Sequence, residues 1–282
     1  TQTYADYTQT KTDIIYFREI YGEHNVYNLL FAVLAAYLYL KDQNLNIEKF
    51  KKYLQKQIFK LKTPAFRQEI VYQNKNLIIV NDSAATTPDA TITAIRRFYN
   101  IRELLQNGRK LSQTYIDYTR TKHRQNEQNN KSEKSVLSRP KSVNREKLIL
   151  ITGGTDKKLD FKELAKEIKK KVKPENLFLL NGSATQKLID ELKKIKYRLK
   201  RENIFEDLQG IVFNIFNKFY FNINNNQRLS SYKENIRVNP RESVVILFSP
   251  ASASFEKFKN EFDRGKKFNK LIKQKLKEYR LI

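Results

Sequence analysis

The sequence contains no cysteine, methionine or tryptophan, and its two histidines are His24 and His123. Without cysteine there are no disulfides, no thiolate metal ligands and no cysteine nucleophile. Two histidines so far apart in the chain do not form a histidine-based metal site. The seven glycines include no Gly-x-x-x-x-Gly-Lys-Ser/Thr sequence, so the chain has no P-loop to hold a nucleoside triphosphate.

Long apolar runs are also missing. The longest extends over residues 29–40 and is followed by Lys41 and Asp42, which is short of the roughly 18 residues that cross a bilayer. The first residues show neither the basic nor the apolar segment of a secretion signal. We therefore expect a cytoplasmic protein without a membrane partner.

Acidic residues are scarce relative to basic ones, with 30 Asp or Glu against 55 Lys or Arg and a formal charge of +25. Nucleic-acid binding is one interpretation, because basic residues displace the counterions condensed on phosphates. However, Asn, Ile and Tyr are in excess together with Lys, as in A+T-rich coding sequences, and no nucleic-acid-binding module accompanies the charge. We favour solvated surface lysines and do not expect a nucleic-acid partner.

Apolar periodicity divides the chain into two parts. Residues 25–40 and 47–59 have the spacing of helices, and residues 69–73 and 76–80 read as two strands joined by a tight turn. Beyond them strands alternate with helices. Further strands are expected at 147–152, 177–180 and 243–248, and helices at 184–195, 205–216 and 254–275.

Two helix starts have recognisable capping sequences. Thr87-Pro88-Asp89 combines an N-cap, an N1 proline and an acidic first-turn residue. Asp160 and Glu163 resemble a capping box. We expect a helix to follow each of them.

The alternation predicts an α/β fold, with a mainly parallel sheet covered by helices on both faces. The expected domains are residues 1–62 and 63–282. Two polar stretches interrupt the pattern: an insertion at about 106–145, which has too few aliphatic residues to bury a face, and a shorter loop at 222–239.

Three loops carry residues suited to binding anions, at 82–87, 153–158 and 249–255. Each follows an expected strand, and ligands of open α/β sheets bind beyond the carboxyl ends of the strands. Taken singly, these loops have simpler explanations. Thr86, Thr87 and Ser254 are then helix caps, and Lys157 is an exposed charge.

Taken together, the loops resemble the Mur ligase family, in particular its D-glutamate-adding members. The similarity rests on Gly22-Glu23-His24-Asn25, Asn81-Asp82-Ser83-Ala84-Ala85-Thr86, Gly153-Gly154 with Lys157, and Ser249-Pro250-Ala251-Ser252-Ala253-Ser254-Phe255, which Arg264-Gly265 follows. It covers about Tyr21 to the C-terminus, apart from the two polar stretches.

The resemblance implies the C-terminal, Rossmann-like domain of a Mur ligase, preceded by the helical end of the central ATPase domain (residues 1–62). The activity implied is the ATP- and Mg²⁺-dependent addition of D-glutamate to UDP-N-acetylmuramoyl-L-alanine in peptidoglycan synthesis. The N-terminal domain and most of the ATPase domain, with the P-loop and the metal ligands, have no counterpart in the sequence. The segment alone is therefore expected to be inactive.

The resemblance also implies site residues, none of them certainly catalytic. Those expected to bind ATP are Asn25 and Asn28 at the adenine, Arg67, and Asp82 at the ribose. Those expected to bind D-glutamate are Thr86, Lys157, Ser254, Phe255 and, more peripherally, Phe262. In two places the sequence departs from the family: Ala84 stands where many members have lysine, and Ala65-Phe66-Arg67 replaces Pro-His-Arg.

Two other functions stay open from the sequence. The first is an inactive remnant with the same fold, which binds an acidic ligand or a partner protein. The second is a basic nucleic-acid-binding protein, which predicts salt-dependent retention on DNA.

Overall fold

The computed structural model describes residues 23–57, 64–74, 77–99, 147–227 and 244–282. They fall into two compact units, a helical unit within residues 23–57 and a sheet unit that begins at Pro64. The insertion expected at 106–145, together with His123, lies outside the described residues.

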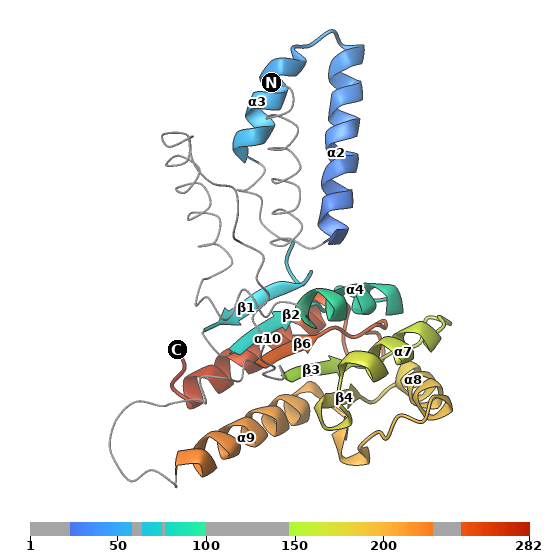
Figure 1. Ribbon diagram of the computed structural model, residues 1–282, viewed down its shortest axis with the longest axis vertical. Coiled ribbons are helices and arrows are strands. Elements are labelled where there is room, and N and C mark those ends of the chain that lie inside the picture. The colour runs from blue at the N-terminus through green and yellow to red at the C-terminus, as the bar shows by residue number, and fades with distance from the viewer. Residues whose placement is uncertain (1–22, 58–63, 75–76, 100–146, 228–243) are drawn as a thin grey trace, which may run out of the picture. The chain divides into compact units, whose positions relative to one another are not determined.

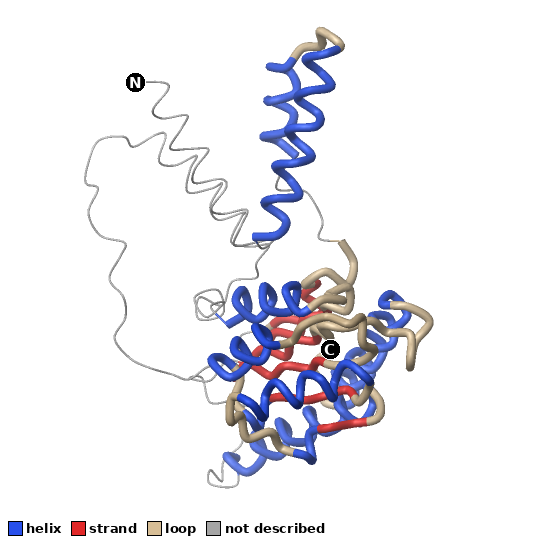
Figure 2. The backbone as a smooth tube through the Cα atoms, turned by 90° about the vertical axis from the view of Figure 1, so that its right-hand side faces the viewer, coloured by secondary structure: helices blue, strands red, loops and turns tan. Residues whose placement is uncertain are grey.

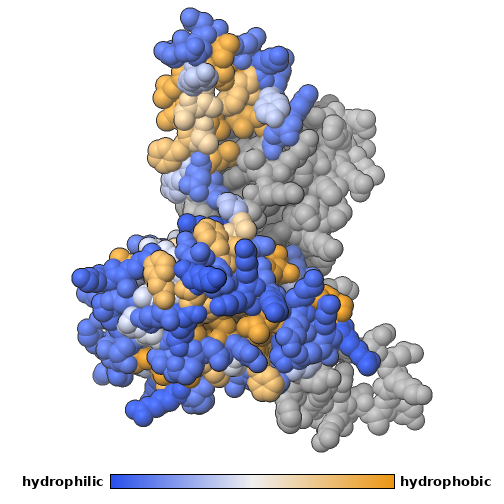
Figure 3. Space-filling model, turned by 180° about the vertical axis from the view of Figure 1, so that it is seen from behind, coloured by the Kyte–Doolittle hydropathy of each residue, from blue (hydrophilic) through white to orange (hydrophobic). Residues whose placement is uncertain are grey.

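The helical unit consists of α2 (Glu23–Asp42) and α3 (Ile47–Gln57), as the sequence predicts. Asn46 caps α3, because its Oδ1 accepts the N–H of Lys49 at 2.9 Å. Apolar side chains of α2, such as Phe31 and Leu38, are exposed and give this unit the apolar surface visible in Figure 3. No helix in the described part of the chain is both long enough and apolar enough to cross a membrane.

The sheet unit is built on six strands, most of them parallel (Figure 1). The strands are β1 (Glu69–Gln73), β2 (Leu77–Asn81), β3 (Lys147–Thr152), β4 (Leu177–Leu180), β5 (Ile204–Phe205) and β6 (Val244–Phe248). Their order is β1-β2-β6-β3-β4-β5. The edge strand β1 is antiparallel to β2, and every other pair is parallel. The prediction of a mainly parallel sheet is confirmed.

Helices cover both faces of this sheet (Figures 1 and 2). They are α4 (Pro88–Tyr99), α7 (Lys162–Lys171), α8 (Ser183–Lys194), α9 (Leu208–Gln227) and α10 (Glu261–Glu278), with short 3₁₀ turns η2 (Pro174–Asn176) and η3 (Arg201–Asn203). On one face, α9 and α10 pack against alternate strand residues such as Ile79, Ile149 and Ile246. The intervening strand residues, such as Leu150 and Leu247, are equally buried. Full burial of each such side chain contributes about 1.5–3 kcal/mol.

One of the two expected helix caps is confirmed and the other is wrong. Thr87 caps α4, since its Oγ1 accepts the N–H of Ala90 at 3.4 Å. Before α7, the N-cap is Phe161, which makes no capping bond through its side chain. Asp160 instead accepts the N–H of Lys162 at 2.8 Å, which is a local turn rather than a capping box.

Two expected boundaries are also wrong. Residues 222–227, predicted as loop, continue α9 to Gln227. The helix expected at 254–275 begins only at Glu261. The residues between Ser254 and α10 form turns, so the loop that follows β6 is longer than the sequence suggests.

Candidate functional site

The loops predicted to bind ligands all leave one edge of the sheet. Strands β2, β6 and β3 are neighbours and parallel, so their carboxyl ends meet there. Backbone hydrogen bonds continue the sheet into these loops, from Asp82 N to Phe248 O at 2.7 Å and from Ser249 N to Ile151 O at 3.0 Å. The loop starts are therefore fixed relative to one another.

The loops that carry Lys157 and Ser254 pair directly with each other. Thr155 N donates to Ala253 O at 3.1 Å, and Ala253 N donates back to Thr155 O at 3.0 Å. This isolated antiparallel bridge lies two residues before Lys157 and one before Ser254. The prediction that the two loops meet at one edge of the sheet is confirmed.

Two glycines allow the loop after β3 to pass close to the neighbouring segments. Gly153 and Gly154 have φ angles of 107° and 140°, which side chains rarely adopt. A Cβ on Gly153 would lie 2.4 Å from Thr185 Oγ1 and 2.5 Å from Leu180 O. Only glycine fits here, because the end of β4 passes directly against the backbone.

The five residues expected to bind D-glutamate differ in their surroundings. Lys157 is exposed and Thr86 is half-buried. Ser254 is only 3% exposed, and its Oγ has no hydrogen-bond partner among the described residues. Phe255 and Phe262 are exposed by 67% and 50%. Ser254 thus presents a buried, unsatisfied hydroxyl, while the other four side chains reach solvent.

A helix was expected to begin at Ser254, but the N–H groups near this residue do not belong to a helix start. Instead, Ser254 O accepts the N–H of Phe258 at 2.9 Å within a turn. The N-cap of α10 is Asn260, which accepts the N–H of Asp263 at 2.8 Å. A helix dipole therefore does not act at Ser254.

Asp82 is held inside the sheet unit, with 2% of its surface exposed. Its Oδ1 accepts the N–H of Gln68 at 3.0 Å, and its Oδ2 accepts the hydroxyl of Ser249 at 2.8 Å. Burial raises the pKa of Asp82 to about 7, against the opposing effects of these two hydrogen bonds and of Arg67 and Arg97. The carboxyl group, directly after β2, thus joins the residue before β1 to the residue after β6.

Arg67 belongs to a short segment that packs against the loop after β2. Phe66 has a φ of 62°, and its carbonyl accepts the N–H of Ala84 at 3.0 Å. The ring of Phe66 covers Gly265, where a Cβ would lie 2.5 Å from the ring. This arrangement leaves the side chain of Arg67 exposed.

Arg264 is an important part of this edge that the sequence analysis quoted without a role. The side chain is fully buried, and its guanidinium donates to Ser83 Oγ at 3.1 Å, Ser83 O at 2.8 Å, Ala253 O at 2.9 Å and Ser252 O at 3.1 Å. Burial lowers its pKa to about 10. Arg264 therefore fastens the loop after β2 to the loop after β6. The sequence does not reveal this role, because Arg264 is one of many basic residues in a Lys-rich segment.

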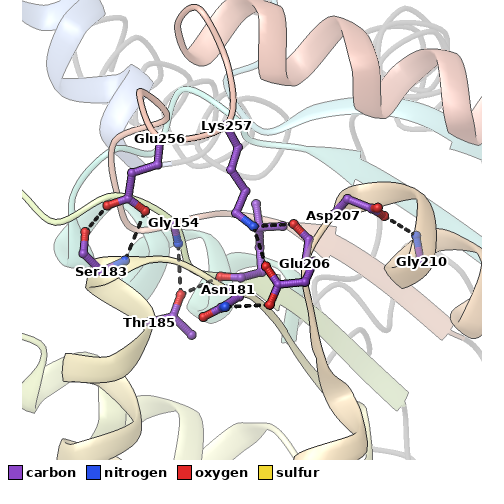
Figure 4. A network of polar contacts seen from close by, with 10 residues as sticks. Gly154, Asn181, Ser183, Thr185, Glu206, Asp207, Gly210, Glu256 and Lys257 are labelled. Atoms are coloured by element: carbon purple, nitrogen blue, oxygen red, sulfur yellow. Dashed lines mark hydrogen bonds and ion pairs between the residues drawn. The ribbon is translucent and has the colours of Figure 1, made fainter.

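A polar network extends the site to the loops after β4 and β5 (Figure 4). Glu256 accepts hydrogen bonds from the hydroxyl of Ser183 and, at 3.2 Å, from its N–H. Lys257 lies 3.0 Å from Glu206, which also accepts from Asn181 Nδ2 at 2.7 Å. The loop after β6 is thus tied to its neighbours on both sides.

The two asparagines expected at the adenine lie in the helical unit. Asn25 and Asn28 are one turn apart on α2, and Asn28 Nδ2 donates to Asn25 Oδ1 at 3.4 Å.

Among the residues that the structure describes, no group of three His, Asp or Glu side chains is placed to hold a metal ion.

Comparisons with known proteins find relatives over most of the chain. No family model matches the chain. A UDP-N-acetylmuramoylalanine–D-glutamate ligase from Borreliella afzelii (strain PKo) is 30% identical over 210 residues, which are 73% of this chain and 30% of that protein. The ligase of the same name from Fusobacterium nucleatum is 28% identical over 252 residues, 89% of this chain and 40% of that protein.

A third such ligase, from Prochlorococcus marinus (strain MIT 9515), is 26% identical over 254 residues, 90% of this chain and 37% of that protein. The chain spans 30 to 40% of the length of these three curated relatives. The resemblance drawn from the loop motifs is confirmed. The chain is homologous, over most of its length, to a portion of the UDP-N-acetylmuramoylalanine–D-glutamate ligases.

Proposed function

We propose that this chain supplies the D-glutamate-binding part of an ATP-dependent ligase. The complete enzyme joins D-glutamate to UDP-N-acetylmuramoyl-L-alanine in cytoplasmic peptidoglycan synthesis. The relatives that carry this name support the proposal. Because the sequence has no P-loop, the activity requires polypeptide beyond these 282 residues.

The observation that carries the proposal is the unsatisfied hydroxyl of Ser254 beside the loop of Lys157. A buried hydroxyl without a partner costs about 1–3 kcal/mol, and a substrate carboxylate that displaces the atoms covering Ser254 would remove that cost. Lys157 adds an ammonium group on the loop paired with that of Ser254. A hydroxyl and an ammonium on adjoining loops suit a dicarboxylic amino acid.

Three further side chains complete the proposed glutamate site. The hydroxyl of Thr86, on the loop after β2, is a second neutral partner for a carboxylate. Phe255 and Phe262 are exposed, and the ring of Phe262 meets that of Phe66 edge-on at 6.2 Å. These rings border the site rather than bind charge.

ATP with Mg²⁺ supplies the phosphoryl group that activates the substrate carboxyl for attack by the amine of D-glutamate. The exposed guanidinium of Arg67 suits a phosphate, and the amides of Asn25 and Asn28 suit a base. Asp82 fits less directly, because both of its oxygens accept internal hydrogen bonds. Because Asp82 is 2% exposed, a ribose reaches it only if the residues around it move.

A chimera tests the proposal. In it, this chain replaces the matched portion of the Borreliella afzelii ligase, and steady-state kinetics are measured with each substrate varied in turn. Lys157→Ala is expected to raise the KM for D-glutamate about 10- to 100-fold and to leave that for ATP nearly unchanged, because a charge-assisted bond is lost. Ser254→Ala acts in the same direction more weakly.

Lys158→Ala is the matched control, since this exposed lysine is adjacent in sequence and is not assigned to the substrate. It is expected to leave both KM values unchanged. The glutamate assignment is abandoned if Lys157→Ala and Ser254→Ala change only the dependence on ATP. A chimera that folds but forms no amide favours the inactive-remnant alternative.

A further inference from the structure

The positive charge is distributed unevenly over the sheet unit. At the carboxyl edge of the sheet, segments 153–160, 181–183, 206–210 and 255–263 contain seven Asp or Glu residues and four Lys residues. At the opposite edge, where α7 and α8 end, segments 169–173 and 193–201 contain ten Lys or Arg residues and no acidic residue. Compositional drift alone would distribute lysines over both edges.

The two basic segments form one continuous surface, here called the basic ridge (residues 169–173 and 193–201). Tyr197 is buried and its hydroxyl donates to Val172 O at 3.1 Å. Lys169 Nζ donates to Ile195 O at 2.5 Å. Helices α7 and α8 lie side by side in Figure 1, and these bonds join their C-terminal ends.

Acidic residues neutralise only part of the ridge. Five of them adjoin it in the chain or pair with it: Glu167, Glu175, Asp190, Glu191 and Glu202. Six basic residues of the ridge have no carboxylate within 4.0 Å among the described residues: Lys169, Lys170, Lys173, Lys196, Arg198 and Arg201. The ridge is therefore a surface of concentrated, uncompensated positive charge.

The charge is also crowded. Burial lowers the pKa of Lys171; Glu167 opposes this effect, whereas Lys170 and Arg96 add to it. Repulsion between like charges destabilises the isolated protein, and a polyanion bound to the ridge would relieve it.

We propose that the basic ridge adsorbs the protein to an anionic lipid surface. The ridge offers little for a nucleic-acid base to stack on, because Tyr197, the aromatic residue within it, is buried. The neighbouring ring of Tyr99 is 40% exposed, but Lys171 Nζ covers one face of it at 4.1 Å from the centroid. The charges of the ridge are spread over the ends of two helices and the chain that follows α8, which suits a planar array of head groups. Ile195 and Leu199 are half-buried, so the attachment is electrostatic rather than insertion into the bilayer.

The expectation of no membrane partner rested on the lack of an apolar run long enough to span a bilayer. Adsorption through surface charge needs no such run, so the proposal departs from that expectation. Each basic residue near an anionic bilayer strengthens adsorption about fivefold, and the effect fades beyond a Debye length of about 10 Å. The carboxyl edge, which carries the proposed substrate loops, faces away from the ridge along the strands.

Vesicle flotation with the full 282-residue chain tests the proposal. The chain is expected to float with vesicles of equal parts phosphatidylglycerol and phosphatidylcholine, and not with phosphatidylcholine alone. The triple variant Lys170→Gln, Lys196→Gln, Arg201→Gln is expected to bind about 100-fold more weakly. The matched control is Lys162→Gln, Lys266→Gln, Lys270→Gln, which removes the same charge from exposed positions outside the ridge.

Both variants are expected to fold, because all six residues are exposed, and circular dichroism checks this. A control variant that binds vesicles as tightly as the unaltered chain supports the proposal. Equal weakening of the two variants overturns it, since net charge alone would then explain the binding. The proposal is also overturned if a short DNA duplex binds more tightly than the anionic vesicles at the same salt concentration and displaces them.

Discussion

Replacing Arg264 by leucine is expected to destabilise the sheet unit by about 3 kcal/mol or more. The guanidinium donates four hydrogen bonds from a charged group, which together contribute about 6 kcal/mol at the lower limit. Burial of the charge costs roughly 3 kcal/mol, as the fall of its pKa from 12.5 to about 10 indicates. The difference is the expected loss.

Hydrogen exchange at the β6 amides measures this loss, because these buried amides report on the sheet unit alone. Lys266→Leu is the control, since Lys266 is exposed on the same helix and its replacement is expected to change the free energy by less than about 0.5 kcal/mol. In some proteins the replacement of a buried charge by an apolar residue is stabilising, so the experiment has two distinct outcomes. If Arg264→Leu leaves the opening free energy within 1 kcal/mol of the unaltered chain, Arg264 does not hold the two loops together.

Three further predictions concern other parts of the chain. The pKa of Asp82 is raised from 3.8 to about 7 in the folded protein, so between these pH values the folded state holds a proton on Asp82 that the unfolded state has lost. The stability that Asp82 contributes therefore falls as pH rises from about 4 to about 7. Asp82→Asn is expected to remove this fall in the free energy of unfolding, which amounts to about 4 kcal/mol at most. Urea unfolding of both proteins between about pH 4 and about pH 7 is the test. The prediction is contradicted if the two proteins lose stability in parallel as pH rises. Gly153→Ala is expected to lower the free energy of unfolding by at least about 2 kcal/mol, because the new Cβ would lie 2.4 Å from Thr185 Oγ1. Gly210→Ala is the control: its nearest atom lies at 3.1 Å, and the change in thermal unfolding is expected to stay within about 1 kcal/mol. Equal losses for the two glycines would disprove the close-approach argument. The isolated chain is expected to release no phosphate from ATP and Mg²⁺, since it lacks a P-loop; phosphate release that Asp82→Asn abolishes would refute this.

Much of the sheet could be predicted from the sequence because its strands are short apolar runs with clear ends. The boundaries of β3 and β4 agree with the predicted 147–152 and 177–180. Gly153-Gly154 ends the first, and Asn181-Gly182 follows the second. Burial on both faces leaves little choice of residue in such strands, so composition alone locates them.

The start of α10 could not be predicted in the same way. Phe255, Phe258 and Phe262 lie within the helix expected at 254–275, and their spacing is compatible with a helix. In the structure the loop is held instead by contacts with distant residues, such as Glu256 with Ser183 and Ala253 with Thr155. Tertiary hydrogen bonds therefore override the local pattern.

The candidate site divides along the same line. Sequence motifs located the loops, because their small and hydroxylic residues follow the strands directly. They did not reveal that Arg264 fastens two of these loops or that Asp82 is enclosed, because both facts depend on contacts across more than 150 residues of chain. The burial of Ser254 was equally hidden, although it is the observation on which the glutamate site rests.

The most direct test of the proposed function is an NMR titration of the ¹⁵N-labelled chain with D-glutamate. The amide signals of Thr86, Lys157 and Ser254 are expected to shift together with one affinity, and equal concentrations of L-glutamate are expected to leave them in place. Lys157→Ala is expected to abolish the shifts while the rest of the spectrum stays the same. Shifts confined to other parts of the sheet unit, or equal shifts with both enantiomers, would contradict the claim that these loops bind D-glutamate.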